Sequence, residues 1–498
     1  MKAYIKAYDL NVLLRLANLI VCGIIIALYV KMGADSSLVD FFTIVLAVIF
    51  AIENIGMLSY EKRKRNPFII ILVFVTTVFY LLRIATIIHI PESALYYGIV
   101  SDFGAENMNN AMLFILLANG AMFLGFCLGA AGKSIARRRV PDTGAGPRLF
   151  APAVIFVIVI LASYSDVLGS AVLGGRMTGY IQNFLNRYTI FLFTFTMLAF
   201  YYDRISKRLK VLLAGIVLTF VLLITLGGSR SAILWVFIIF TIGLLAIQQR
   251  MRISRKLTAV ALVFIPVAVI FFITATFKQQ MGIKESVTLE HVYQAREQEI
   301  FDEEHIQSYL SILYFRIGFL DYSSELIAAS DIYKRIINIP YYIDSVVDNV
   351  LSPGFDVFGV SKVSNVLSYI RRGDPLPDRE QVQQAYQSDQ LGIYGEYYVL
   401  FQGYLSLAVF FITAFVFQRI YVRFKYDTVR SSIYRAVVLY LFYTWLNSFG
   451  MDWFLFDLIT ILITMSLFSR FYVQKRTRKA PAHNNACPAA GTADCAVS

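Results

Sequence analysis

Arginines recur in the connectors between the long apolar segments of this chain. A guanidinium group stays charged, and its planar fork donates two hydrogen bonds at once, so it suits a ligand that carries phosphate oxygens. A lone arginine at a membrane surface more often anchors a lipid headgroup. The candidate set is Arg176, Arg187, Arg230, Arg316, Arg371 and Arg372. Taken together, they predict a site for a phosphate-bearing ligand.

Arg230 has the most specific surroundings of this set. It stands in LGGSRSAIL, a very short connector between two apolar segments. Gly227 and Gly228 allow a close approach of the backbone to a ligand, and Ser229 and Ser231 supply hydroxyl groups. We therefore expect Arg230 to bind the ligand rather than a lipid headgroup.

Four side chains in or after the long acidic connector can orient or deprotonate a hydroxyl group. They are His291, His305, Asp389 and Glu396, of which Glu396, His305 and Asp389 are the catalytic candidates. The string DEEH at 302–305 predicts a solvated acidic face, because consecutive residues of a helix do not converge on one metal ion. We expect no metal and no cofactor.

The composition indicates a membrane protein. The chain of 498 residues is 58% hydrophobic and 16% charged, with a mean hydropathy of +0.64. Its net charge of +12 comes from Lys and Arg that flank apolar runs, as the positive-inside rule describes, and not from a basic groove. We expect membrane lipids as partners and no nucleic acid.

Apolar runs of about 20 residues are long enough to cross a bilayer. The sequence predicts about twelve such spans, near 11–31, 40–60, 68–90, 111–131, 149–167, 185–203, 209–227, 231–248, 256–276, 395–421, 432–449 and 452–473. Glu53 and Arg83 stand inside neighbouring spans, where burying a charge is costly, so we expect them to form an ion pair. The predicted fold is an all-α polytopic membrane protein.

Lys and Arg gather in every second connector. EKRKRNP follows the second span, and similar clusters follow the fourth, sixth, eighth and tenth spans and the last one. The positive-inside rule places these connectors and both termini in the cytoplasm. The remaining connectors are short or acidic and should face the periplasm.

The connector 277–393 is the longest, with 17 Asp and Glu against 10 Lys and Arg. Apolar residues recur at three- and four-residue intervals in 306–336, which predicts a helix. Pro340 and Pro353-Gly354 break a second apolar stretch. We expect short amphipathic helices on the outer membrane face that roof a cavity.

These patterns divide the chain into four parts. Residues 1–276 form a nine-helix bundle, 277–393 a large periplasmic loop that roofs the site, 394–475 three C-terminal spans and 476–498 a disordered cytoplasmic tail. None of the four cysteines is placed for an external disulfide or a zinc site. The first span has no cleavage site and should be retained.

The arrangement of these motifs resembles Wzy-type polymerases of O-antigen or oligosaccharide repeat units. The similarity lies in the Gly-Gly-Ser-Arg-Ser turn that enters a span, in Arg176 followed eleven positions later by Arg187, in the Arg316 segment of the long loop and in Gly395-Glu396 at the next span. It covers most of the chain as a layout, through short motifs.

The resemblance implies a GT-C class membrane glycosyltransferase in the bacterial inner membrane, with its active site facing the periplasm. Its substrate would be an oligosaccharide on undecaprenyl diphosphate, and a chain-length regulator protein is a possible partner. Arg176, Arg187, Arg230 and Arg316 match positions where the family places arginines that hold diphosphate or glycan, and Glu396 matches an acidic position. A diphosphate is a good leaving group, so cations can replace a metal in this reaction.

Two other functions fit the same layout. An O-antigen ligase would hand the finished glycan to lipid A core, although its external histidine motif has no secure match around His291 or His305. A transporter or flippase of lipid-linked sugars would share the number of spans. The sequence shows no repeat between its halves and few charges at mid-membrane depth, which argues against transport.

Overall fold

The computed structural model describes residues 8–32, 38–64, 66–89, 104–130, 318–348, 357–371, 391–424, 429–447 and 450–472, with short pieces at 238, 241–243, 245–246 and 252–253. These residues are mostly helical. Apart from helices they include one two-residue antiparallel pairing, of β1 (Tyr8–Asp9) with β2 (Arg252–Ile253). The predicted spans 149–167, 185–203, 209–227 and 256–276, most of 231–248 and the tail 476–498 lie outside the described residues.

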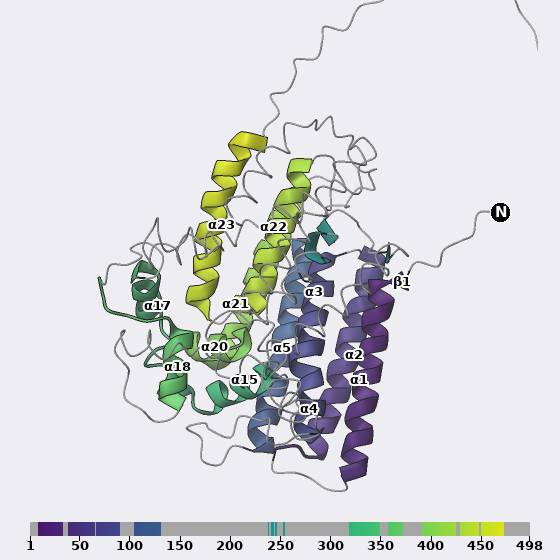
Figure 1. Cartoon of the computed structure of the whole chain (residues 1–498). Helices are drawn as coiled ribbons and strands as arrows, with labels where there is room; N and C mark the ends of the chain where they lie inside the picture. Colours follow the sequence, from purple (N-terminus) through teal and green to yellow (C-terminus); the bar gives the residue numbers. More distant parts are fainter. Residues whose placement is uncertain are drawn as a thin grey trace, which may run out of the picture.

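The N-terminal helices run side by side (Figure 1). They are α1 (Leu10–Met32), α2 (Phe41–Lys64), α3 (Pro67–Thr76), the π-helical turn η1 (Thr77–Leu81), α4 (Leu82–His89) and α5 (Ala105–Gly129). Together α3, η1 and α4 make one continuous rod. These helices coincide with the first four predicted spans to within a few residues, except that α5 begins six residues before 111.

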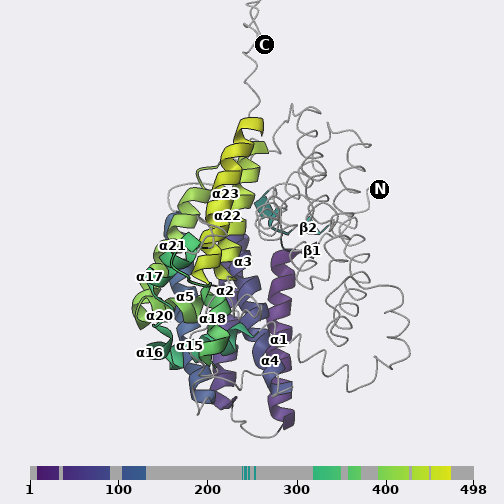
Figure 2. The ribbon, with the colours of Figure 1, turned by 60° about the vertical axis from the view of Figure 1, so that its left-hand side comes forward.

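The C-terminal part of the chain contributes a second set of helices. These are α20 (Ile393–Leu400), the short 3-10 turn η5 (Gly403–Leu405), α21 (Ser406–Tyr421), α22 (Val429–Leu446) and α23 (Met451–Tyr472). Helix α22 packs against α3, and α23 lies next to α22 (Figure 1 and Figure 2). The predicted span 395–421 is wrong at its start, because the chain turns at Phe401 and Gln402 and separates α20 from α21.

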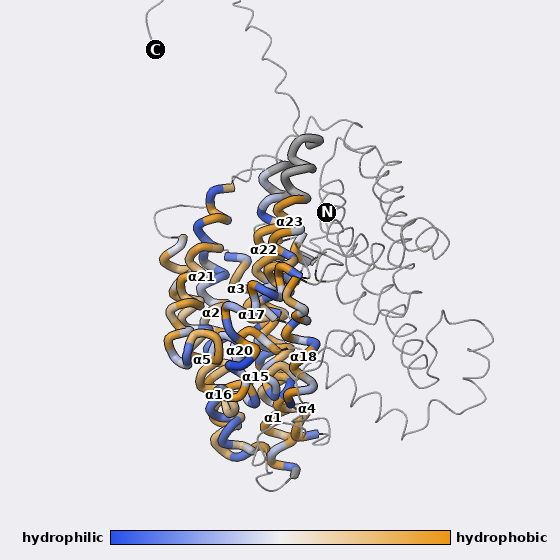
Figure 3. The backbone as a smooth tube through the Cα atoms, turned by 90° about the vertical axis from the view of Figure 1, so that its left-hand side faces the viewer, coloured by the Kyte–Doolittle hydropathy of each residue, from blue (hydrophilic) through white to orange (hydrophobic). Residues whose placement is uncertain are grey.

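Five helical rods are long and apolar enough to cross a membrane, counted within the described residues. They are Leu10–Lys31, Phe41–Lys62, Pro67–His89, Ala105–Gly129 and Gly403–Tyr421. Large apolar side chains stay exposed on the described surface of several of them, for example Leu117, Leu124 and Leu128 on α5. Figure 3 shows how far hydrophobic residues extend along these helices. Such surfaces suit lipid chains, so the apolar helices indicate a membrane protein.

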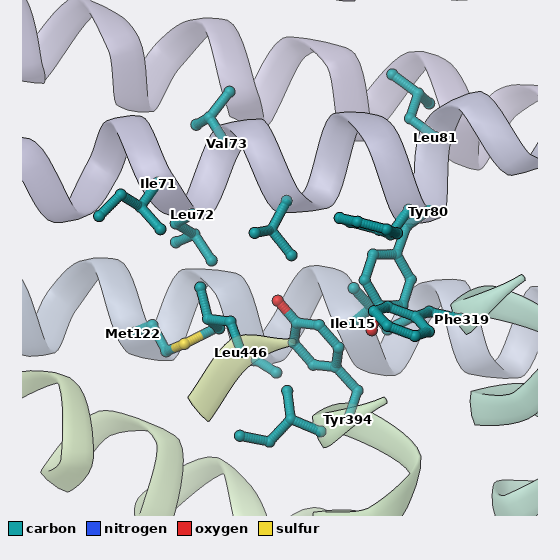
Figure 4. Close-up of a cluster of buried hydrophobic side chains, with 14 of the residues drawn as sticks. Ile71, Leu72, Val73, Tyr80, Leu81, Ile115, Met122, Phe319, Tyr394 and Leu446 are labelled. Carbon is teal, nitrogen blue, oxygen red and sulfur yellow. The ribbon is translucent and has the colours of Figure 1, made fainter. Parts of the chain in front are cut away.

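The hydrophobic core lies between α3, α5, the connector helix α15 (Phe319–Ala328) and the C-terminal helices. Phe68 stacks on Phe126 with ring centroids 5.2 Å apart, and Phe442 meets Phe68 edge-on at 5.0 Å. Figure 4 shows the other side of this core, where Tyr80, Phe319 and Tyr394 converge from three segments distant in the sequence. Aromatic packing therefore joins the first spans to the long connector and to the last spans.

Helices α5 and α21 pack very closely, because α5 has glycine at positions 125 and 129. A Cβ at Gly125 would overlap the carbonyl oxygen of Phe411 and lie 3.0 Å from Ala414 Cβ. A Cβ at Gly129 would lie 2.8 Å from Gln418 Cβ. Two glycines four positions apart let helix backbones approach within a membrane.

Replacing Gly125 with leucine should lower the unfolding temperature in detergent by several degrees. The side chain would force α5 away from the backbone of α21, which loses packing along the whole contact. The matched control is Gly56→Leu, because nothing lies within 4 Å of a Cβ at Gly56. Equal unfolding temperatures for the two variants would show that the α5 and α21 contact does not hold the bundle together.

Helix ends that the charge pattern places on one side of the membrane lie together in the structure. Asn66 at the start of α3 donates from Nδ2 to Gln418 Oε1 near the end of α21, at 2.9 Å. Gln418 also packs against Gly129 at the end of α5. At the opposite end, Thr43 at the start of α2 donates to Asn109 Oδ1 on α5, at 2.8 Å. The bundle thus has two defined ends, here named the Gln418 end and the Asn109 end.

A polar network links α1, α2 and the π-helical turn inside the bundle. Asn54 Nδ2 donates to Asn18 Oδ1 at 2.8 Å, and the hydroxyl of Thr77 donates to the same oxygen at 3.2 Å. Thr77 also donates to the carbonyl oxygen of Val73 at 2.6 Å. Hydrogen bonds of this kind fix the rotation of each helix about its axis, because burying one partner alone is unfavourable.

The described part of the long connector forms short helices, as expected. The predicted helix 306–336 is described from Gly318 and is divided into α15 (Phe319–Ala328) and α16 (Ser330–Tyr333). The second apolar stretch is interrupted beside Pro340, as predicted: residues 334–338 form turns and bends, and α17 (Ile339–Val346) begins with Pro340 in its first turn. A proline there loses no helical hydrogen bond, and Asn338 caps the helix by accepting from Tyr341 N at 2.9 Å.

One carboxylate contacts the backbone that precedes the next helix. Asp348 Oδ1 accepts from the backbone N–H groups of Val357 and Phe358 at 3.0 and 3.1 Å, and Oδ2 accepts from Val360 N at 2.8 Å. Residues 357–362 lead into α18 (Val363–Arg371). The side chain at 348 therefore ties the end of α17 to the start of α18.

Candidate functional site

Two of the predicted site residues, Glu396 and Arg371, lie in the described part of the chain. The others lie outside it: Arg176, Arg187, Arg230, Arg316, Arg372, His305 and Asp389, together with His291. Glu396 and Arg371 border the same cluster of buried apolar side chains, which includes Tyr322 of α15 and Tyr342 of α17. This second core lies under the connector helices α15 to α18, separate from the core of the bundle.

Helices α15 and α20 cross closely at the centre of the site. A Cβ at Gly395 would lie 2.8 Å from Ser323 Cα and 3.0 Å from Leu326 Cβ, so only glycine permits this approach. Gly392 precedes α20 with a φ of +66°, a left-handed conformation that glycine adopts readily. Gly395 thus has a packing role, and it sets the position of its neighbour Glu396.

Glu396 joins three segments of the chain. It is fully buried, and its Oε1 accepts from the hydroxyl of Tyr342 on α17 and from the backbone N–H of Met451 at the start of α23, the latter at 2.6 Å. Its Oε2 has no hydrogen-bond partner among the described residues. Burial raises the pKa of Glu396 to about 8, against the opposing effect of the two donors.

Asp452 continues this buried network on α23. Its Oδ2 accepts from Ser345 Oγ on α17 and from the backbone N of Val363 on α18, both at 2.9 Å. Its Oδ1 accepts from Trp453 N at 2.8 Å. Glu396 and Asp452 together hold α17, α18, α20 and α23 in one arrangement.

Lys362 and Trp453 form the outer rim of this network. Lys362 Nζ lies 3.5 Å from the centre of the Trp453 ring, and the indole N–H of Trp453 donates to Ser364 Oγ at 2.8 Å. An ammonium group above an indole face is a favourable cation–π contact. It adds a further link between the start of α18 and α23.

Arg371 ends α18 and is largely buried. Its guanidinium carbon lies 5.0 Å from the centre of the Tyr322 ring on α15. This contact holds the C-terminal end of α18 over α15 and directs a cation into the site. The sequence placed Arg371 and Arg372 together in the ligand set, and the structure describes Arg371 alone.

Arg83 is paired, but with a partner other than the expected Glu53. Its Nε and Nη2 donate to Asp321 Oδ1 and Oδ2 of α15 at 2.9 and 2.6 Å, and its Nη1 donates to Thr86 Oγ1 at 3.1 Å. Both partners of the ion pair are almost completely buried. The predicted Glu53–Arg83 pair is therefore wrong, because the connector helix α15 inserts an acid that satisfies the guanidinium fork.

Sequence reasoning missed Tyr342, Asp452 and Asp321. Tyr342 stands among other aromatic residues of the connector, and Asp452 stands at the edge of a span, where an acidic residue is unremarkable. Asp321 could have been found from the sequence, because a buried arginine requires an acidic partner and Asp321 is an acid that directly follows an apolar segment. A deliberate search for partners of Arg83 would have included it.

The described geometry brings Arg371 and the carboxyl groups of Glu396, Asp452 and Glu325 to the second core, with tyrosine hydroxyls beside them and Lys362 at the rim. Such an arrangement can position helices precisely and orient polar groups of a ligand that enters from the connector side.

Comparisons of the chain with protein-family models, with curated proteins and with solved structures found no match.

Proposed function

We propose that this protein is a polymerase of lipid-linked oligosaccharide repeat units in the bacterial inner membrane. The observation that carries the proposal is the set of arginines in the connectors that lack a Lys/Arg cluster. The most specific of them is Arg230, within the segment Gly-Gly-Ser-Arg-Ser. The planar guanidinium group of an arginine suits a diphosphate, and a donor on undecaprenyl diphosphate presents one at the membrane surface. The product would be O-antigen or exopolysaccharide.

The orientation follows from the charge of the connectors. The Gln418 end of the bundle is flanked by the clusters after the second, fourth and tenth predicted spans, so we assign it to the cytoplasm. The Asn109 end then faces the periplasm. In this orientation we expect the connectors that carry the arginine set, and the helices α15 to α18, on the periplasmic side. A lipid-linked donor that has been moved across the membrane would bind the protein there.

In the proposed reaction a hydroxyl oxygen of the acceptor repeat unit attacks the anomeric carbon of the growing chain. The new glycosidic bond forms as the bond to undecaprenyl diphosphate breaks, and the hydroxyl proton passes to a base. Arg230 and Arg316 stabilise the negative charge on the departing diphosphate. Because Glu396 is buried and bonded to Tyr342 and Met451, we assign it a positioning role and keep His305 and Asp389 as candidates for the base.

The test is the surface polysaccharide of cells that carry Arg230→Ala in place of the wild-type chain. Long polysaccharide should disappear, while single repeat units and the level of the protein stay unchanged, because only the diphosphate clamp is lost. Arg230→Lys keeps the charge without the bidentate fork, so it should restore chains in part. Normal chain lengths in Arg230→Ala cells would reject the proposal.

A strain that lacks the protein separates the alternatives. Single capped repeats on lipid A core indicate a lost polymerase. Intact polymer left on the carrier would indicate a ligase, and lipid-linked units trapped on the cytoplasmic side would indicate a flippase. Electrophoresis of the surface polysaccharide, followed by analysis of the lipid-linked pool, distinguishes these outcomes.

A further inference from the structure

A pocket of about 390 Å³ opens at the Asn109 end of the bundle, on the side of α20 that carries Tyr398. Its volume lies within the range of about 300–1,000 Å³ that is usual for small-molecule sites. Helices α5, α15 and α20 and the turn η5 each contribute to its wall. The lining residues are Asn107, Asn110, Ile327, Ala328, Tyr398 and Tyr404.

Aromatic rings form one wall of the pocket. Tyr398 and Tyr404 meet edge to face with their ring centroids 6.0 Å apart. The Phe114 ring contacts both of them edge to face, with centroid distances of 5.0 Å to Tyr398 and 5.9 Å to Tyr404. Tyr404 remains 53% exposed, so its ring is available to a ligand. A flat, supported tyrosine with a polar edge suits the C–H face of a pyranose ring, which is apolar at its centre and hydroxylated at its rim.

Carboxamides of α5 form another part of the wall. Asn107 and Asn110 stand three positions apart in the first turns of α5, so both side chains lie on one side of the helix. Each carboxamide has two N–H donors and an acceptor oxygen, a combination that matches neighbouring sugar hydroxyls. Asn109 between them is bonded to Asp40 and Thr43, which fixes the start of α5.

None of the described lining residues carries a charge. Lys334, whose charge acts on Tyr398, forms an ion pair with Asp331 at 2.7 Å. The described part of the wall therefore offers a phosphate headgroup no dedicated cation, and four of its six side chains are polar, which does not suit an acyl chain. The chemistry of this described wall favours an uncharged, polyhydroxylated ligand.

The backbone holds Tyr404 in place at some conformational cost. Gln402 adopts φ +59° and ψ +63°, the only positive φ of a residue other than glycine in the described chain, and Gly403 follows with φ +75°. A left-handed residue with a side chain is uncommon and is often found at binding sites. This turn ends α20 and places the Tyr404 ring beside Tyr398.

We propose that this pocket binds a sugar ring of an uncharged glycan segment. The proposal rests on the function proposed above and extends it: the pocket would hold a segment of the acceptor or of the growing chain, whereas the arginines would hold the diphosphate. Tyr404 stacks on the ring, Tyr398 closes the wall beside it, and Asn107 and Asn110 bond its hydroxyls.

Binding is tested on the full-length protein in a polyoxyethylene detergent, which has no sugar headgroup. The probe is the lipid-free repeat-unit oligosaccharide released by mild acid from the polysaccharide of the same cells. We expect saturable binding by calorimetry and saturation transfer from protein to ring protons by NMR. Tyr404→Ala should weaken binding about tenfold through loss of the stacked ring.

Two further variants complete the design. Asn110→Leu, at an exposed position of α5, should weaken binding without removing an aromatic ring, and Phe358→Ala is the control, because Phe358 is an exposed aromatic residue outside the pocket. Unchanged unfolding temperatures show that each variant is folded. Binding by Tyr404→Ala and Asn110→Leu equal to that of Phe358→Ala would overturn the assignment of the pocket.

Chain length in cells separates this inference from the proposed function. Tyr404→Ala should shorten the polysaccharide, whereas Arg230→Ala should remove it. Loss of chains in Arg230→Ala cells with normal oligosaccharide binding by Tyr404→Ala protein rejects the pocket alone. Normal chains in Arg230→Ala cells with weakened binding by Tyr404→Ala protein reject the polymerase and leave a glycan-binding pocket.

Discussion

Replacing Arg83 with methionine should destabilise the protein by about 3–5 kcal/mol, the usual cost of removing one partner of a buried ion pair. The guanidinium makes two bonds to Asp321 and is almost inaccessible to solvent. Without it, the carboxylate of Asp321 stays buried between α4 and α15 with its main counter-charge gone. Thermal unfolding of the purified protein in detergent should show a large fall in the midpoint.

The double variant Arg83→Met, Asp321→Leu is the matched control. It removes both charges and fills the space with apolar side chains, so it should recover most of the stability that the single variant loses. Thr86→Val deletes only the hydroxyl that accepts from Arg83 Nη1, and should cost about 1 kcal/mol. A single variant as stable as the wild type would show that the ion pair does not hold α15 against the bundle.

Changing Glu396 to glutamine should remove a large pH dependence of stability. The pKa of this carboxyl rises from 4.5 to about 8 through burial. Below pH 4.5 the folded and unfolded states are both protonated, so the contribution of the neutral side chain is fully present. As the pH rises to about 8, the unfolded chain releases its proton while the folded protein keeps it, and stability falls.

The size of this effect follows from about 1.4 kcal/mol for each unit of pKa shift, so it reaches a few kcal/mol. Unfolding midpoints measured from pH 5 to pH 9 should decline steeply for the wild type and much less for Glu396→Gln. A glutamine can place its carbonyl oxygen where Oε1 accepts from Tyr342 and Met451, so the fold is kept.

Asp452 lies in the same network and its charge helps to raise the pKa of Glu396, so the difference between the two profiles reports Glu396 together with its coupling to Asp452. Glu106→Gln, an exposed position in the first turn of α5, is the control that should leave the profile unchanged. Parallel profiles for the wild type and Glu396→Gln would mean that the carboxyl is ionised and solvated, contrary to its buried position.

The sequence predicted the described helices well where one physical signal dominates. Apolar runs of about 20 residues are required for a bilayer, and α1, α2 and the rod of α3 to α4 match the predicted spans to within a few residues. The turn at Phe401 and Gln402 was not predicted, because one polar residue beside a glycine, here Gln402 and Gly403, barely changes the average hydropathy of a span. Backbone conformation decided that boundary.

The site was less predictable, since its contacts join distant parts of the chain. Arg83 and Asp321 are 238 positions apart, and Tyr342 and Glu396 are 54 positions apart. No local periodicity encodes such pairs. The choice of Glu53 as the partner of Arg83 used proximity in the chain, whereas burial of a guanidinium requires an acid with matching geometry, whichever segment supplies it.

The π-helical turn at Thr77–Leu81 gives the third rod two separate binding faces. One extra residue per turn rotates everything beyond it by about 100° relative to a continuous α-helix. In α3, before the turn, Phe68 packs against Phe126 and Phe442 of the bundle. In α4, after the turn, Arg83 pairs with Asp321 of the connector. The rod therefore contacts the bundle through α3 and the connector through α4. Deleting a single residue from η1 would rotate Arg83 away from Asp321 and leave the contacts of α3 in place.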